Sequence, residues 1–309
     1  MELPDFIFQA EENLVEKAWG GNWIADLKGL RIDKKIGESW EFSTHPSRPS
    51  YVNINGRKVN LIDLVEKFKS DILGELKTDT IPILVKLLDI KTRISVQVHP
   101  SDQIAKMLGE KDNGKDEAWI VIGGGKVFIG FKDDVSQEDL RNAKLIEKMN
   151  KIEAEHLDVF YIPAGVIHFA ENARLFEIST NSDLTYRIYD FSGRETQIEK
   201  ALKALRMKKT PVEEIKGEKG KIVTDKFVAK VVEGEAEFEI NTFNIILALE
   251  GPLTLKSKRE VANLKRGYSC LIPAKTGKYT VEGDAKFIHV CAGDFYKMSL
   301  RKPRSLERG

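Results

Sequence analysis

The chain has 309 residues, of which 41% are hydrophobic and 31% are charged, and its formal net charge is +1. A chain of this length buries a full core and accommodates two domains of ordinary size, and its near-neutral charge excludes nucleic-acid binding driven by bulk charge. It shows no signal-peptide pattern and no apolar run of about 18 residues. We therefore expect a cytoplasmic protein without a membrane or nucleic-acid partner; the oligomeric state is not predictable.

The first third of the chain combines strand and helix patterns. Residues 38–43 alternate as a strand does, and residues 59–76 carry an apolar stripe with helical spacing, which predicts one helix of about five turns. His45 precedes a proline, so we expect a turn residue rather than a ligand. Residues 81–98 are apolar and rich in β-branched side chains, which predicts two strands broken near residues 89–93.

Lys86 lies inside the first of these two strands. Such a lysine either extends to solvent from a sheet edge or points into a polar cavity, and the sequence favours neither. Residues 101–108 predict a short helix capped by Ser101 or Asp102, and residues 136–149 predict a helix capped by Ser136.

The centre of the chain holds a strand, turn and strand pattern that ends on a histidine. Apolar runs flank the sequence Pro-Ala-Gly at residues 163–165, where proline ends a ladder and glycine permits a positive φ, and His168 follows this turn. Upstream, strand alternation turns Gln97 and His99 to one face, and Glu117 opens the next apolar run. Two imidazoles, a carboxylate and an amide oxygen suit zinc, and also manganese, cobalt or iron. The neutral amide favours an open, catalytic site.

These motifs resemble those of known proteins. The pattern Pro-x-Gly-x-x-His-x-x-x-Asn at residues 163–172, with Glu117 and Gln-x-His upstream, resembles the two cupin metal motifs, although Lys91 and Leu157 replace the opening glycines. The Gln-x-His-Pro start and the segment Ser-Asp-x-Thr-Tyr-Arg-x-Tyr-Asp at residues 182–190 are similar to those of one cupin family, the type I phosphomannose isomerases. The resemblance implies a mainly β fold, a double-stranded β-helix (jelly-roll) barrel with inserted helices.

The resemblance also implies a function: the zinc-dependent interconversion of mannose 6-phosphate and fructose 6-phosphate through an enediol, with one zinc ion per chain and a small sugar phosphate as substrate. On strand pattern alone Arg187 is as well explained by a surface ion pair, but the family signature places it in the active site. Positions matching functional residues of the family are Lys86, Lys115 and Asp183. The general base stays open among Asp183, Lys115, Glu177 and water on the metal, and Lys115 and Arg194 are the cations available for the phosphate.

The last third of the chain predicts a second β unit. The charged residues 208–221 suggest a linker, so we expect a catalytic domain at residues 1–209 and a degenerate cupin-like domain at residues 210–309. The second domain has a Gly-x5-Pro motif at residues 267–273, but Lys278 stands where a ligand histidine would follow. His289 is expected in the packed core, and Cys270 and Cys291 as buried thiols.

Two other function classes remain at this stage. A non-catalytic sugar-binding or regulatory cupin is disfavoured by the intact ligand set. An iron-dependent cupin oxygenase is disfavoured by Gln97 and by the segment at residues 182–190.

Overall fold

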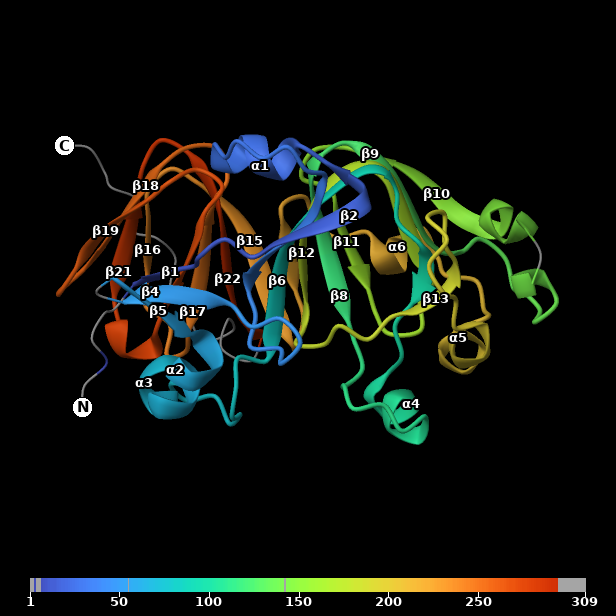
Figure 1. Ribbon diagram of the computed structural model, residues 1–309, viewed down its shortest axis with the longest axis horizontal. Coiled ribbons are helices and arrows are strands. Elements are labelled where there is room, and N and C mark those ends of the chain that lie inside the picture. The colour runs from blue at the N-terminus through green and yellow to red at the C-terminus, as the bar shows by residue number, and fades with distance from the viewer. Residues whose placement is uncertain (1–2, 4–6, 55, 142, 294–309) are drawn as a thin grey trace. The chain divides into compact units, whose positions relative to one another are not determined.

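The structure is a computed structural model that describes residues 3, 7–54, 56–141 and 143–293 (Figure 1). The chain divides into two compact units. The larger unit comprises Glu12–His45 and Ile83–Ile222, and the smaller unit comprises Met1–Glu11, Pro46–Pro82 and Val223–Gly309. No helix among the described residues is long and apolar enough to span a membrane.

These units differ from the expected ranges 1–209 and 210–309, because backbone pairing joins segments that are distant in sequence. In the smaller unit the N-terminal strand β1 (Phe8–Gln9) pairs with β20 (Ser269–Ile272). The expected linker also belongs to the larger unit. Thr210 donates a backbone hydrogen bond to Phe131, and Gly217 donates one to Val159. The last change of unit along the chain therefore comes at residue 223.

The larger unit is built on one antiparallel sheet, whose main path runs in the order β10-β9-β12-β6-β3-β2. Its strands are β2 (Leu14–Gly21), β3 (Ile36–Phe42), β6 (Ile83–Arg93), β7 (Val96–Val98), β8 (Glu117–Gly123), β9 (Gly125–Phe131), β10 (Met149–Ala154), β11 (Val159–Ile162), β12 (His168–Thr180) and β13 (Tyr186–Tyr189). The long strand β12 pairs with β7 and β9 near its start and with β6 and β8 further along, so the sheet curls around it. The mainly β prediction is confirmed.

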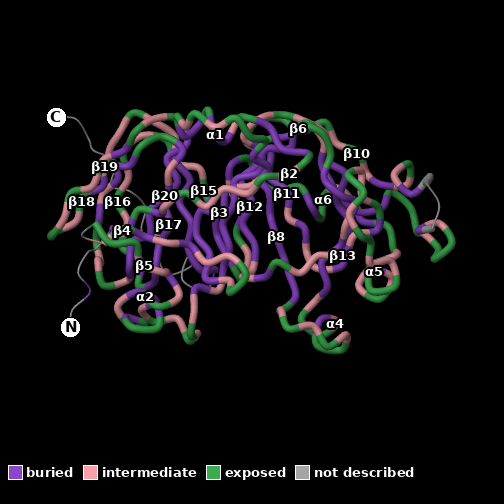
Figure 2. Tube along the Cα trace, viewed as in Figure 1, coloured by how far each residue is buried: buried purple, intermediate pink, exposed green. Residues whose placement is uncertain are grey.

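The strands at the centre of this sheet are buried along most of their length (Figure 2). In β12, Leu175, Phe176 and Ile178 are fully buried, which explains the apolar run at this point of the sequence. The predicted break near residues 89–93 is wrong. Strand β6 continues to Arg93, because its backbone stays paired with β12 as far as Glu171, and the break comes just before β7.

Short helices connect the strands of the larger unit. They are α1 (Trp23–Lys28), α4 (Asp102–Met107), α5 (Ile198–Ala204), α6 (Val212–Ile215), and the 3-10 helices η1 (Asp139–Arg141) and η2 (Ala143–Lys148). Helix α4 is confirmed with Ser101 as its cap, since Ser101 Oγ accepts from Ile104 N at 3.3 Å.

The predicted α-helix at residues 136–149 is wrong in type. Ser136 and Asp139 do form the reciprocal cap contacts, with Ser136 N donating to Asp139 Oδ2 at 2.8 Å. The cap nevertheless opens 3-10 turns, and strand pairing with β9 already begins at Met149. The capping contacts predicted from the local sequence are thus present, but strand pairing determines the conformation of the rest of the segment.

The smaller unit is a second β structure. Its strands include β1, β4 (Tyr51–Ile54), β5 (Arg57–Asn60), β15 (Phe227–Glu233), β16 (Ala236–Phe238), β17 (Asn244–Ala248), β18 (Leu253–Ser257), β19 (Val261–Leu264), β20, β21 (Tyr279–Glu282) and β22 (Lys286–Ala292), and β14 (Lys221–Val223) spans the boundary. Its helices are α2 (Leu61–Lys67), α3 (Lys69–Leu73) and the 3-10 helix η3 (Ala274–Thr276). As predicted, Cys270 and Cys291 are buried free thiols and His289 is a buried core residue.

The single helix predicted at residues 59–76 is divided. Residues before Leu61 belong to β5, and Phe68 has φ −123° and ψ 37°, which separates α2 from α3. Phe68 and Ile72 are both buried, so the apolar stripe continues across the break. The helical spacing of apolar residues alone therefore could not show where the break between α2 and α3 lies.

Candidate metal centre

Three strand ends and one turn bring the predicted ligands together in the larger unit. Gln97 lies on β7, and His99 follows it directly, while Glu117 opens β8 and His168 opens β12. Backbone pairing sets His168 opposite Gln97. Gly165, at φ 88°, donates its backbone N–H to the carbonyl oxygen of His99 at 2.8 Å, so the Pro-Ala-Gly turn fixes the two histidine segments to each other.

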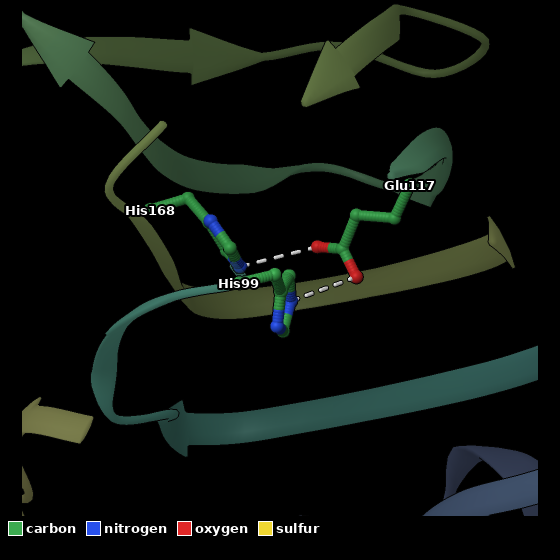
Figure 3. A group of neighbouring side chains, drawn as sticks. All are labelled: His99, Glu117 and His168. Carbon is green, nitrogen blue, oxygen red and sulfur yellow. Dashed lines mark ion pairs between the residues drawn. The ribbon is translucent and has the colours of Figure 1, made fainter. Parts of the chain in front are cut away.

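The side chains of His99, Glu117 and His168 converge on one point (Figure 3). Their ligand atoms all lie within 4.8 Å of one another, and all three residues are buried. Oε1 of Glu117 is 3.2 Å from Nε2 of His168, and Oε2 is 3.2 Å from Nε2 of His99. Two histidines and one glutamate in so compact an arrangement are a ligand set suited to a divalent metal ion.

Hydrogen bonds to backbone carbonyls fix both imidazole rings. Nδ1 of His99 donates to the carbonyl oxygen of Leu184 at 2.8 Å, and Nδ1 of His168 donates to that of Val166 at 2.9 Å. Because each Nδ1 donates to a carbonyl oxygen, Nε2 is the nitrogen of each ring that can bind a metal ion. Nε2 of His99 faces Glu117, and Nε2 of His168 lies between Glu117 and the side-chain amide of Gln97.

Several of these atoms lack a hydrogen bond of good geometry within the described part of the chain. They are Nε2 of His99 and both carboxylate oxygens of Glu117, all buried. Burial and the nearby Lys115 ammonium lower the pKa of His99 to about 4, so the ring stays neutral. Burial alone would raise the pKa of Glu117, but Lys115 and the two histidines hold it well below its usual value. Buried lone pairs that lack a well-aligned hydrogen-bond donor fit a bound cation.

Gln97 contacts the same group through its side-chain amide. Its Nε2 lies 3.2 Å from Nε2 of His168, and its Oε1 accepts from Ser95 Oγ at 2.9 Å. In this orientation the amide nitrogen faces the cluster. Rotating the amide by about 180° would present the oxygen instead, and the Ser95 hydroxyl can donate or accept in either case.

Lys115 and Lys86 both enter a carboxylate-rich region beside this cluster. Lys115 Nζ lies 2.6 Å from Glu117 and 2.9 Å from Glu177, and these two carboxylates outweigh burial and raise the pKa of the lysine. Lys86 is buried, with Nζ 3.7 Å from Glu177 and 3.5 Å from Asp183. The structure thus decides between the two alternatives for Lys86, which points into a polar site rather than to solvent.

Sequence reasoning passed over Glu38 and Trp40 as parts of this region. Glu38 Oε2 lies 3.8 Å from Lys86 Nζ and accepts from Trp40 Nε1 at 2.8 Å. Burial opposes ionisation of Glu38, but Lys86 and Lys17 lower its pKa to about 2. The sequence did contain a signal for this contact. Strand alternation places Glu38 and Trp40 on one face of their strand, and the role of the buried-strand residue Lys86 was left open.

His45 is also more than the turn residue that was expected. Its Nε2 lies 2.9 Å from Oδ2 of Asp112, and the same oxygen accepts from the backbone N–H of Asp183 at 2.9 Å. His45 therefore helps hold the segment that carries Asp183. Its partner lies 67 positions away in the chain, so no local pattern could show the contact.

Arg187 and Arg194 lie on and just after β13. Asp190 Oδ2 accepts from Nε of Arg194 at 2.9 Å and forms an ion pair with its terminal nitrogen at 2.7 Å. In contrast, Nε of Arg187 is buried without a hydrogen bond in the described residues. Burial and the charge of Arg194 lower the pKa of Arg187. Arg187 is thus not the surface ion pair that its strand position allowed.

Comparison with known proteins decides the family. A profile described as "Phosphomannose isomerase type I, catalytic domain" matches residues 7–132, and one described as "Mannose-6-phosphate isomerase, cupin domain" matches residues 225–292. The Bacillus subtilis protein YvyI, provisionally named a mannose-6-phosphate isomerase, is 30% identical over 301 residues, which cover 88% of this chain and 95% of YvyI. The chain belongs to the type I phosphomannose isomerase family.

Solved structures agree with this assignment to the isomerase family. A provisionally assigned mannosephosphate isomerase from Archaeoglobus fulgidus is 43% identical, has a TM-score of 0.88, and the match covers 94% of this chain and 99% of that one. The mannose 6-phosphate isomerase from Bacillus subtilis is 29% identical with a TM-score of 0.81, and the match covers 93% and 100% of the two chains. The expected cupin fold is thereby confirmed.

Proposed function

We propose that this chain is a zinc-dependent mannose-6-phosphate isomerase, which interconverts mannose 6-phosphate and fructose 6-phosphate by proton transfer through an enediol. One observation carries the proposal. In a member of an isomerase family, the imidazole nitrogens of His99 and His168 and the carboxylate of Glu117 converge at one buried point, where Nε2 of His99 and both Glu117 oxygens lack a hydrogen bond within the described residues. The larger unit holds every residue named in this proposal.

Zinc fits this donor set. Imidazole nitrogens and a carboxylate are common zinc ligands, and three protein ligands leave room for a substrate in catalytic sites. We assign Gln97 as a further ligand through its amide oxygen, after the rotation described above. When bound, the metal would polarise the sugar carbonyl and orient the substrate.

The cations beside the cluster would offset negative charge on the reacting sugar. Arg187 has a buried Nε–H that no acceptor within the described residues satisfies, so it has a donor to offer to an anion. Lys86, held 3.5 to 3.8 Å from three carboxylates, supplies a second positive charge, and Lys115 supplies a third. Preorganised charge of this kind stabilises a transition state by roughly 3 kcal/mol per donor in oxyanion holes.

The contacts narrow the choice of general base. Lys115 keeps its proton because two carboxylates raise its pKa, so we assign it to charge stabilisation rather than proton abstraction. Two carboxylates remain among the candidate side chains. Asp183 has a side chain that is 47% exposed, whereas Glu177 is buried and paired with Lys115. We favour Asp183, because a carboxylate that reaches solvent can exchange the abstracted proton.

The same contacts favour Arg194 over Lys115 for the phosphate. Lys115 is buried between Glu117 and Glu177, whereas Asp190 holds Arg194 in a fixed orientation beside Arg187, and its side chain is 33% exposed. A planar guanidinium binds phosphate oxygens in a bidentate manner. We therefore propose that Arg194 contacts the phosphate of the substrate.

Conversion of mannose 6-phosphate in D₂O, followed by NMR, tests the proposal. The zinc-loaded protein should form fructose 6-phosphate, and part of the product should carry deuterium at C1, because a base that abstracts the C2 proton can exchange it with solvent before returning it. A zinc-loaded, folded protein that forms no fructose 6-phosphate would contradict the proposed function. Product without any deuterium would contradict exchange at a solvent-accessible base.

A further inference from the structure

The backbone of Arg187 is held from two sides. On one side β13 pairs with β7, where Arg187 lies opposite Gln97, and the register shifts between Arg187 and Tyr189. On the other side, the N–H of Arg187 donates to Oε1 of Gln197 at 3.0 Å, and its carbonyl oxygen accepts from the backbone N–H of Gln197 at 2.8 Å. A single residue thus meets both backbone groups of Arg187, as a neighbouring strand would.

Gln197 is itself fixed in place. It precedes helix α5, and its carbonyl oxygen accepts from Ala201 N at 2.9 Å. Its Nε2 donates to the carbonyl oxygen of Glu195 at 3.2 Å. The two ends of the amide therefore have different partners, one a donor and one an acceptor. If the amide were turned around, its NH2 group would face the N–H of Arg187 and its oxygen would face the carbonyl oxygen of Glu195. Only one orientation therefore satisfies both contacts.

The side chain of Arg187 depends on this backbone support. Residues directly opposite each other on paired strands project from the same face, so Arg187 shares the face of Gln97, the candidate metal ligand. Its Nε makes no hydrogen bond in the described residues, and a register shift of the kind that redirects side chains begins directly after Arg187. The direction of the guanidinium is therefore set by the main chain.

We propose that Gln197 is a positioning residue for Arg187. It holds the main chain of Arg187 so that the guanidinium faces the metal cluster, and it touches neither substrate nor metal. The inference rests on the proposed function, in which Arg187 stabilises charge on the reacting sugar. A misplacement of about 1 Å in such a group costs up to roughly a hundredfold in rate.

Steady-state kinetics of Gln197→Leu, Gln197→Glu and the control Glu195→Ala test this role on zinc-loaded protein with mannose 6-phosphate. Leucine removes the acceptor for the Arg187 N–H, so kcat should fall by roughly tenfold or more with KM little changed. Glutamate keeps an oxygen as acceptor for the Arg187 N–H but sets its second oxygen against the Glu195 carbonyl, so it should recover part of that loss. The Glu195 side chain is exposed, and its removal leaves the backbone carbonyl in place, so Glu195→Ala should match the wild type. Wild-type kcat in Gln197→Leu would overturn the inference.

A double-mutant cycle with Arg187→Ala separates positioning from general damage. If Gln197 acts through Arg187, the double variant should be no slower than Arg187→Ala alone. Independent, multiplying losses would overturn the inference. Should Gln197→Leu fail to fold, the same cycle with Gln197→Glu, whose smaller loss should also vanish without Arg187, gives the decision.

Hydrogen exchange of the peptide that contains Arg187 needs no substrate. The Arg187 amide should exchange faster in Gln197→Leu than in the wild type, and an unchanged rate would overturn the inference whatever the protein acts on. Failure of the wild type to isomerise mannose 6-phosphate would instead count against the proposed function.

Discussion

Arg187 lies directly opposite Gln97 across the pair of strands β7 and β13. The candidate charge stabiliser and a candidate metal ligand therefore project from the same face of the sheet. Gln97 in turn lies opposite His168 on β12. Two adjacent backbone pairings thus place Arg187, Gln97 and His168 at neighbouring positions across three paired strands.

Replacing Arg187 tests whether its charge acts on the transition state. If it offsets charge that develops only in the enediolate, Arg187→Ala should lower kcat and kcat/KM together by roughly a hundredfold, about 3 kcal/mol, with KM little changed. A coupled assay on samples of known metal content measures this. If Arg187 instead binds phosphate, KM should rise while kcat holds.

Arg187→Lys is the matched control, because lysine keeps the charge but not the planar fork. Partial recovery would indicate that a point charge suffices, and no recovery would indicate bidentate geometry. Wild-type kinetics in Arg187→Ala with zinc bound would remove the residue from the active site.

Replacing His168 tests the metal assignment. His168→Ala should lose zinc while keeping its β structure, because pairing of β12 with four other strands holds this region, not one ligand. Elemental analysis and far-UV circular dichroism measure the two properties on one sample. His156 lies outside the cluster, so His156→Ala serves as a histidine control and should keep its zinc. Full metal content in His168→Ala would show that the ligand set is assigned incorrectly.

Much of the candidate site follows from local sequence pattern. Alternation on a strand turned Gln97 and His99 to one face, and a proline and glycine turn marked the start of the strand that carries His168. The contacts that the sequence did not show join distant residues. His45 contacts Asp112, and Gln197, at the start of helix α5, holds Arg187 on β13. No local sequence pattern links the residues of either pair.

The fold class was predictable from the sequence, but the division of the chain into two units was not. Alternating segments indicated two β units, whereas the assignment of the N-terminal residues to the smaller unit depends on the pairing of Phe8 with Leu271, more than 260 positions away. Local propensity carries no information about such a pairing. For the same reason the segment after Ser136 formed its predicted cap but not the predicted α-helix.

Buried His289 should make the protein sensitive to mild acid. Burial and the charge of Lys230 lower the pKa of His289 to about 3, while an unfolded chain has the ordinary value near 6.5. Between these two values the unfolded state binds a proton that the folded state does not, so stability falls as pH falls, by up to about 1.4 kcal/mol per pH unit.

Urea unfolding of wild type and His289→Gln at pH 7 and pH 5 measures this contribution. Glutamine does not titrate, so the wild type should lose roughly 2 kcal/mol more than the variant between the two pH values. Carboxylates that titrate in both proteins cancel in the comparison. Equal losses would show that His289 is protonated in the folded protein or that its site opens readily.

Zinc held by His99, Glu117 and His168 should be required for isomerisation. Chelator-treated protein, titrated with zinc and assayed with mannose 6-phosphate at each point, tests it most directly. We predict that activity is absent at the start, rises in proportion to bound zinc and saturates at about one ion per chain, as expected for a single catalytic site. Full activity in metal-free protein, or no activity in protein that holds one zinc ion, would contradict the account.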